Sequence, residues 1–102
     1  MNGPIPISIE KMRQELPPLW KVDSSTEIPK IVRVYKLSRY LDGLHIVTEL
    51  AILANELDHH PDIALSYGSV EVNLYTHNVR GLSSYDLKFA ISAEERLKSR
   101  YE

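Results

Sequence analysis

The sequence predicts an α+β fold in which a small four-stranded antiparallel sheet carries helices on one of its faces. The first observation is the order of the segments, which reads helix, strand, strand, helix, strand, strand, helix. The second is the alternation over residues 70–76, where one face is apolar and the other is largely polar. The third is the helical spacing of apolar residues over 39–57. No internal repeat or shift in composition divides the chain, so we expect one domain over residues 1–102.

The N-terminal part of the chain is predicted to lead into the sheet. Residues 1–7 contain one glycine and two prolines and are expected to form an extended, loosely held arm. Ser8 is the predicted N-cap of a short helix over 9–16, which two prolines end. Trp20 to Val22 follow as a short strand. Because an indole ring buries a large area, Trp20 is expected to cover the core.

The middle of the chain predicts one strand and the longest helix. Residues 30–37 are dense in β-branched and aromatic side chains, which favours a strand. Ser38 is the predicted N-cap of the helix over 39–57, in which Gly43 lowers the helix propensity slightly and would allow a close helix crossing. The apolar stripe of this helix is wider than one core-facing side requires. We therefore expect it to pack on two sides, with another subunit as the candidate for the second.

The C-terminal half predicts a hairpin followed by a helix. Pro61 ends the long helix, and a short strand is expected over 63–67. Gly68 and Ser69 form the predicted two-residue connection to the strand over 70–76. In the last helix, Ser83 and Asp86 have the spacing of a capping box, with Asp in place of Glu.

Composition excludes several classes of protein. With 43% hydrophobic and 25% charged residues, the chain has the composition of a soluble globular protein. A net charge of -2 argues against a broad nucleic-acid-binding surface, and we expect no direct nucleic-acid partner. There is no cysteine, so disulfides, thiolate metal sites and cysteine nucleophiles are excluded. No segment approaches the ~20 apolar residues of a membrane helix. We expect a cytoplasmic location, with the nucleus as the alternative.

Three of the four histidines gather around the predicted hairpin. His59 and His60 lie in the turn that leaves the long helix, and His77 comes directly after the strand over 70–76. Imidazole exchanges protons near neutral pH, so this arrangement favours an acid/base site. The alternatives are a helix C-terminal cap for the adjacent pair and an exposed turn residue for the third. His45, in the middle of the helix, is expected to be structural.

Other chemistries have little support in the sequence. Adjacent histidines usually point in different directions, and no H-x-x-x-H spacing occurs, so we expect no metal site. The chain also lacks G-x-S-x-G, a P-loop and G-x-G-x-x-G. Nucleophilic acyl transfer, Walker-type phosphoryl transfer and dinucleotide chemistry are therefore not predicted.

The sequence resembles the pterin-4a-carbinolamine dehydratase family. The residues that carry the resemblance are D-H-H-P at 58–61, Tyr67, Val70, T-H at 76–77 and G-L-S-x-x-D at 81–86. The upstream pattern of Trp20 and Tyr35-Lys36-Leu37 is also similar, so that the resemblance extends from about Trp20 to Ala90.

The resemblance implies an activity, a fold and a set of site residues. The family removes water from 4a-hydroxytetrahydropterin to give quinonoid dihydropterin, without a metal or bound cofactor, and serves aromatic amino-acid hydroxylases. Its four-stranded α+β fold assembles as a dimer or tetramer. Histidine acid/base catalysis would then fall to His59, His60 and His77. Pterin binding would fall to Asp58, Tyr75, Thr76, Asn78 and Asp86, the last of which could also orient a histidine.

Three positions depart from the family pattern. Asn55 replaces a carboxylate, with Glu56 out of phase, Ile63 replaces a tryptophan, and Tyr85 replaces a basic residue. The competing hypothesis is an interaction module or transcriptional coactivator that binds a partner through the apolar helix over 39–57.

Overall fold

The computed structural model describes residues 3–97 of the chain. Its elements, in order, are α1 (Ile9–Glu15), β1 (Trp20–Asp23), β2 (Lys30–Lys36), α2 (Tyr40–Leu57), β3 (Asp62–Ser66), β4 (Ser69–Leu74), a 3-10 helix (His77–Val79) and α3 (Ser84–Leu97).

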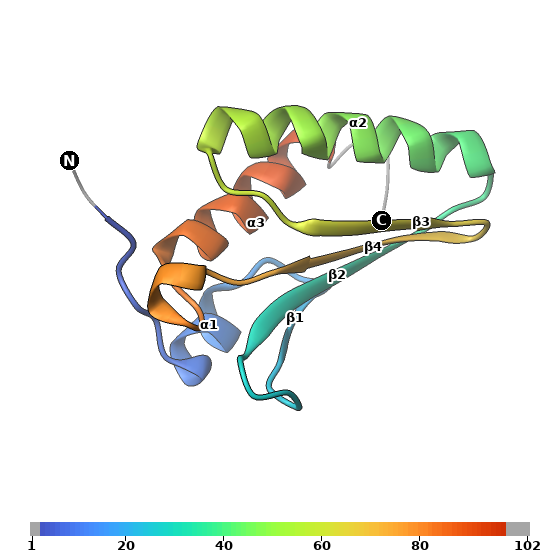
Figure 1. The fold of residues 1–102 in the computed structure, drawn as a ribbon. Helices are drawn as coiled ribbons and strands as arrows, with labels where there is room; N and C mark the ends of the chain where they lie inside the picture. Colours follow the sequence, from blue (N-terminus) through green and yellow to red (C-terminus); the bar gives the residue numbers. More distant parts are fainter. Residues whose placement is uncertain (1–2, 98–102) are drawn as a thin grey trace.

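The four strands form a single antiparallel sheet in the order β1-β2-β4-β3. Figure 1 shows the hairpin of β3 and β4 at one side and the shorter β1 at the other. The hairpin turn lies at Tyr67 and Gly68, one residue earlier than predicted. The reason is that Ser69 already belongs to the sheet, where it pairs with Ser66 on β3 and Lys36 on β2.

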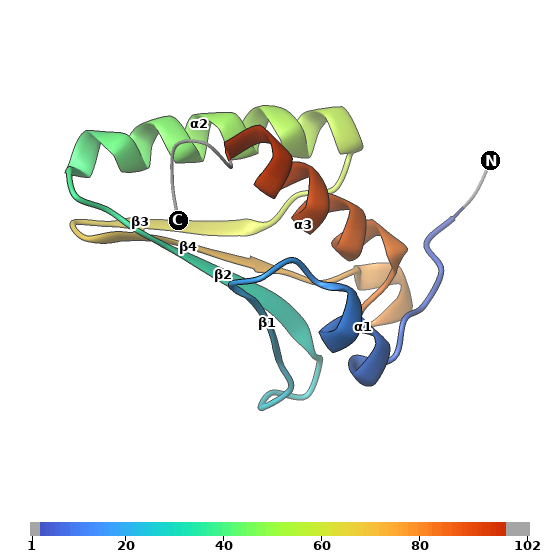
Figure 2. The ribbon, with the colours of Figure 1, turned by 180° about the vertical axis from the view of Figure 1, so that it is seen from behind.

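The helices cover one face of this sheet, so the predicted α+β architecture is confirmed. Figures 1 and 2 show α2 running along the sheet with α3 crossing beneath it, and α1 lying near β1. Alternate residues of β4 are buried against these helices, and the strands contribute Ile31, Tyr35, Val70, Val72 and Leu74 to the core. The helices contribute Met12, Ile46, Leu50, Phe89 and Ala93, among others. The two-residue alternation in the sequence therefore identified the buried face correctly.

A buried polar cluster joins the sheet to α3. Arg33 lies on the inward face of β2 and is only 1% exposed. Its Nε donates to Glu94 Oε2 over 2.9 Å, and the same oxygen accepts from Trp20 Nε1 over 2.8 Å and from the Tyr35 hydroxyl over 3.3 Å. Trp20 is 5% exposed, which confirms its predicted place in the core.

The helix starts agree with the sequence in two cases and differ in one. Ser8 accepts from the Lys11 N–H over 3.1 Å and caps α1 as predicted. The N-cap of α2 is Arg39 rather than Ser38, and it makes no side-chain capping bond. Its guanidinium instead contacts Asp42 in the first turn over 3.1 Å. The positive end of the helix dipole stabilises an acidic side chain in the first turn. Asp42 thus stabilises the start of α2, which has no hydroxyl cap.

The wide apolar stripe of α2 is divided between two environments. Gly43 faces the sheet, where a Cβ would collide with the side chains of Leu65 and Leu37. The glycine thus permits a close approach of helix to sheet, not a helix crossing. On the opposite side of α2, Leu41 is 71% and Leu44 is 53% exposed. This second side is in contact with solvent in the single chain.

The expectation of a loosely held N-terminal arm is wrong for residues 5–7, because their backbone groups are hydrogen-bonded to the segment that opens α3. Ile7 N–H donates to the Leu82 carbonyl over 3.0 Å, and Ser84 N–H donates to the Ile5 carbonyl over 2.8 Å. The Ser84 hydroxyl accepts in turn from the Ile5 N–H over 3.0 Å. Residues 5–7 are thus held beside the segment that opens α3.

Candidate active site

The candidate site forms where the end of α2, the end of β4 and the start of α3 meet. The chain leaves α2 through Asp58, which has a left-handed conformation with φ of 52° and a backbone N–H bonded to the Ala54 and Asn55 carbonyls. This turn places His59 and His60 beside the end of β4. Beyond β4, Thr76 pairs with Gly81 across a tight loop that contains the 3-10 helix and His77.

These segments enclose a cavity of about 620 Å³. The three predicted catalytic histidines all line it, as do Asp58, Tyr75, Thr76 and Asn78. Three further lining residues were not predicted, namely Gly3, Pro4 and Tyr85. The structure therefore brings together residues that the sequence places up to 82 positions apart, from Gly3 to Tyr85.

His59 is held by a buried carboxylate. Its Nε2 lies 2.7 Å from Asp86 Oδ1, and Asp86 is completely buried. The other oxygen, Oδ2, accepts from the Thr76 hydroxyl over 2.9 Å and from the Ser83 N–H over 2.8 Å. An ionised carboxylate only accepts hydrogen bonds, so beside one the ring proton would lie on Nε2 and Nδ1 would be the nitrogen available to a ligand.

Asp86 combines a structural role with this contact. Asp86 accepts from the Ser83 N–H, which is one half of the predicted capping box, whereas the Ser83 hydroxyl accepts from the Tyr85 N–H over 3.1 Å and not from that of Asp86. Asp86 does not line the cavity. Because His59 lies between its carboxylate and the cavity, the geometry favours the orienting role over direct contact with a ligand.

His60 and His77 have weaker, more exposed partners. His60 Nε2 lies 3.0 Å from Asn55 Oδ1, one turn back along α2. Glu56 points elsewhere and pairs with Arg96 over 3.1 Å, which agrees with the expectation that it does not replace the missing carboxylate. His77 Nδ1 lies 3.4 Å from the Tyr75 hydroxyl, and the two rings are 4.6 Å apart.

Two aromatic rings and the N-terminal arm complete the cavity. The Tyr85 ring meets the His59 ring edge-on with centroids 5.7 Å apart, while Tyr75 lies beside His77. Ile63, where the family has a tryptophan, is half-buried on β3 and does not line the cavity. Nothing in the sequence signalled the arm, because its contribution depends on pairing with residues 82–84.

The fourth histidine, His45, does not line this cavity. His45 is on α2, with Nε2 3.8 Å from Glu49 Oε2. Within residues 3–97, no group of three or more His, Asp or Glu side chains has an arrangement that could hold a metal ion. The same part of the chain contains no helix with the length and apolar character needed to cross a membrane.

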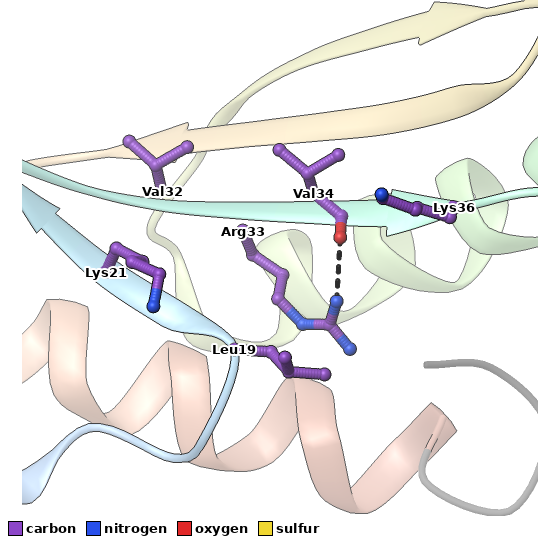
Figure 3. Close-up of a pocket in the computed structure, with 6 residues that line it drawn as sticks. All are labelled: Leu19, Lys21, Val32, Arg33, Val34 and Lys36. Atoms are coloured by element: carbon purple, nitrogen blue, oxygen red, sulfur yellow. Dashed lines mark hydrogen bonds between the residues drawn. The ribbon is translucent and has the colours of Figure 1, made fainter.

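A second cavity, of about 510 Å³, lies beside β1 and β2 (Figure 3). Its walls are Leu19, Val32 and Val34 together with two lysines and Arg33, whose Nη1 donates to the Val34 carbonyl over 2.8 Å. No histidine or carboxylate lines it. The lining of this cavity therefore has no group that exchanges protons near neutral pH, whereas three histidines line the first cavity.

The fold and the first cavity define a class: a small α+β protein with a site lined by three histidines. Comparison with known proteins gives the family. The model of the family described as Pterin 4 alpha carbinolamine dehydratase matches residues 6–96, and the chain belongs to this family.

Relatives and a solved structure agree with this assignment. A protein of Halorhodospira halophila whose name places it in the same family is 34% identical over 95 residues, covering 91% of this chain and 85% of its own. One of Saccharophagus degradans is 30% identical over 91 residues, covering 89% and 80%. The crystal structure of a transcriptional coactivator/pterin dehydratase of Brucella melitensis superposes with a TM-score of 0.73 at 27% identity, covering 84% and 88%.

Proposed function

We propose that this protein removes water from 4a-hydroxytetrahydropterin to give quinonoid dihydropterin by histidine acid/base catalysis. The observation that carries the proposal is the convergence of His59, His60 and His77 on one cavity, with His59 held by the buried Asp86. Family membership supports the same reaction class.

The reaction requires two proton transfers and no external oxidant. A protein acid donates a proton to the 4a-hydroxyl, the C4a–O bond breaks, and water leaves with the bonding electrons. A protein base takes the proton from a ring N–H, whose electrons form the new double bond. The products are water and quinonoid dihydropterin, and solvent exchange restores both protein groups. Each positioned acid or base contributes roughly 10²–10⁴-fold.

The three histidines have different partners, and this suggests a division of roles. Asp86 would stabilise His59 as an imidazolium after Nδ1 has accepted a proton, so His59 suits proton exchange with the ligand. The more exposed His60 and His77 would lie nearer the departing hydroxyl, where the released water can escape. Asp58, Thr76 and Asn78 would bind the donor-rich edge of the pterin, and Tyr75 and Tyr85 would contact its flat faces.

The experiment is to measure quinonoid dihydropterin formation from enzymatically generated 4a-hydroxytetrahydropterin. The wild type is expected to accelerate the reaction, and His60→Ala and His77→Ala are each expected to lose about 100-fold of kcat/KM. His45→Ala is the matched control, because it removes an imidazole that lies outside the cavity. A folded wild type that does not accelerate the reaction over buffer would contradict the proposal.

The substrate and the assembly follow from the same proposal. The 4a-hydroxy compound would be supplied by hydroxylases that use tetrahydropterin, such as those acting on aromatic amino acids. We also propose that the chain forms a homodimer or homotetramer, with the exposed side of α2 as the surface that is covered. The observation favouring this surface is the exposure of Leu41 and Leu44 on a helix whose other side is packed on the sheet.

A further inference from the structure

The N-terminal arm reaches the active-site cavity at a fixed position. Gly3 and Pro4 line the cavity, and Pro4 is half-buried. Directly after them, Ile5 makes two hydrogen bonds with Ser84, one through each of its backbone groups. Pro6 then pairs with Ser83 as an isolated antiparallel bridge. Hydrogen bonds to Ser84 and the pairing with Ser83 therefore hold the arm beside the cavity.

The anchoring residues belong to the segment that holds the catalytic groups in place. Ser83 donates its N–H to Asp86, and Tyr85 lies against His59. Ser84, between them, is the residue that binds the arm. Residues 83–85, at the start of α3, therefore connect the arm to the pair formed by His59 and Asp86.

The chemistry of this wall differs from that of the rest of the cavity. Pro4 presents an apolar ring and has no N–H, whereas Gly3 offers a backbone N–H and carbonyl without a side chain. The other lining residues carry carboxylate, imidazole, amide and hydroxyl groups. The hydrogen-bonding edge of a pterin would find its partners there. The arm is suited to a short carbon chain that carries hydroxyl groups.

We propose that Gly3 and Pro4 bind the substituent on the pterin ring and so set the substrate preference of this protein. This inference rests on the proposed function. It makes the arm a specificity element: it contributes to binding of the substrate and takes no part in the proton transfers. Loss of an apolar contact of about 50 Å² weakens binding by about tenfold.

The experiment compares two substrates, the 4a-hydroxy forms of tetrahydrobiopterin, which has a dihydroxypropyl substituent, and of 6-methyltetrahydropterin. Deletion of residues 2–4 is expected to raise KM for the first about tenfold and for the second less than about threefold, with kcat within about twofold for both. Pro4→Gly, which keeps the chain length, is expected to change KM in the same direction. Pro18→Gly is the matched control, because Pro18 is exposed and lies outside the cavity.

A second measurement does not depend on turnover. Addition of 7,8-dihydrobiopterin to the wild type is expected to slow amide hydrogen exchange at Ile5, Ile7 and Ser84, whose hydrogen bonds hold the arm. Equal KM changes for both substrates, or unchanged KM in the deletion variant, would overturn the arm's role while leaving the dehydratase intact. A wild type that neither binds the pterin nor accelerates the reaction would overturn both proposals.

Discussion

His59 and Asp86 are 27 residues apart in the sequence, yet the His59 Nε2 and Asp86 Oδ1 atoms are 2.7 Å apart. The carboxylate is fully buried and binds three donors from three different segments. One side chain therefore caps α3, holds the loop after β4 and orients a histidine. Because one carboxylate makes all three hydrogen bonds, a substitution of Asp86 is expected to weaken the helix cap, the loop and the histidine contact together.

Asp86→Asn is expected to lower kcat/KM about 100-fold and to destabilise the fold by about 2 kcal/mol. An amide has one accepting oxygen where the carboxylate has two. Its NH₂ group would face either His59, reversing the ring tautomer, or the Thr76 and Ser83 donors. Steady-state kinetics and urea denaturation check the two effects. Asp62→Asn on the exposed side of β3 is the control, and an Asp86→Asn enzyme with unchanged kcat/KM would contradict the orienting role.

Glu94→Gln is expected to destabilise the protein by about 3 kcal/mol, because it leaves the buried Arg33 guanidinium without a counter-charge. Urea denaturation can be followed by the fluorescence of Trp20, the single tryptophan, whose indole donates to the same carboxylate. Glu15→Gln, an exposed change at the end of α1, is the control. Equal unfolding midpoints for wild type and Glu94→Gln would refute this account of the cluster.

Stability is expected to fall above about pH 10 because of Tyr35. Burial, with a further contribution from the Glu94 charge, raises the pKa of Tyr35 well above its usual value, and the Arg33 charge only partly opposes this. Below the usual tyrosine pKa of about 10, folded and unfolded chains both keep the proton. Above it, only the unfolded chain loses the proton, so unfolding is favoured as pH rises.

The test is a comparison of wild type and Tyr35→Phe by urea denaturation between pH 8 and 11. The wild type is expected to lose stability more steeply, by up to about 1.4 kcal/mol per pH unit above pH 10. Subtracting the variant removes the contributions of the other five tyrosines and of the lysines. Parallel curves for the two proteins would show that Tyr35 ionises equally in both states.

Leu41→Glu combined with Leu44→Glu is expected to reduce the particle mass in light scattering. These side chains are 71% and 53% exposed, and a carboxylate on a covered apolar surface is strongly unfavourable. Leu19→Glu, at 55% exposure beside β1, is the matched control. A monomeric wild type at micromolar concentration would contradict self-association through α2, and a binding partner of another sequence would then be the hypothesis to test.

The sequence predicted the regular elements well because their signals are local. Alternation in β4, β-branched residues in β2 and capping residues before α1 and α3 each act over a few positions. The predicted bounds were wrong at two positions, the hairpin turn and the start of α2. Ser69 pairs with two strands at once, which moves the hairpin turn to Tyr67 and Gly68. Arg39 rather than Ser38 is the N-cap of α2, and it makes an ion pair with Asp42 in the first turn.

By itself, the sequence determined the α+β fold, the family and the histidines, since these depend on residue types at short spacings. Tertiary structure alone decided which groups act on one another. It buried Asp86 behind His59, placed Asn55 beside His60 and attached the arm to the start of α3. A hydrogen bond requires its two atoms to lie about 3 Å apart. Only the packing of distant segments brings them to that distance.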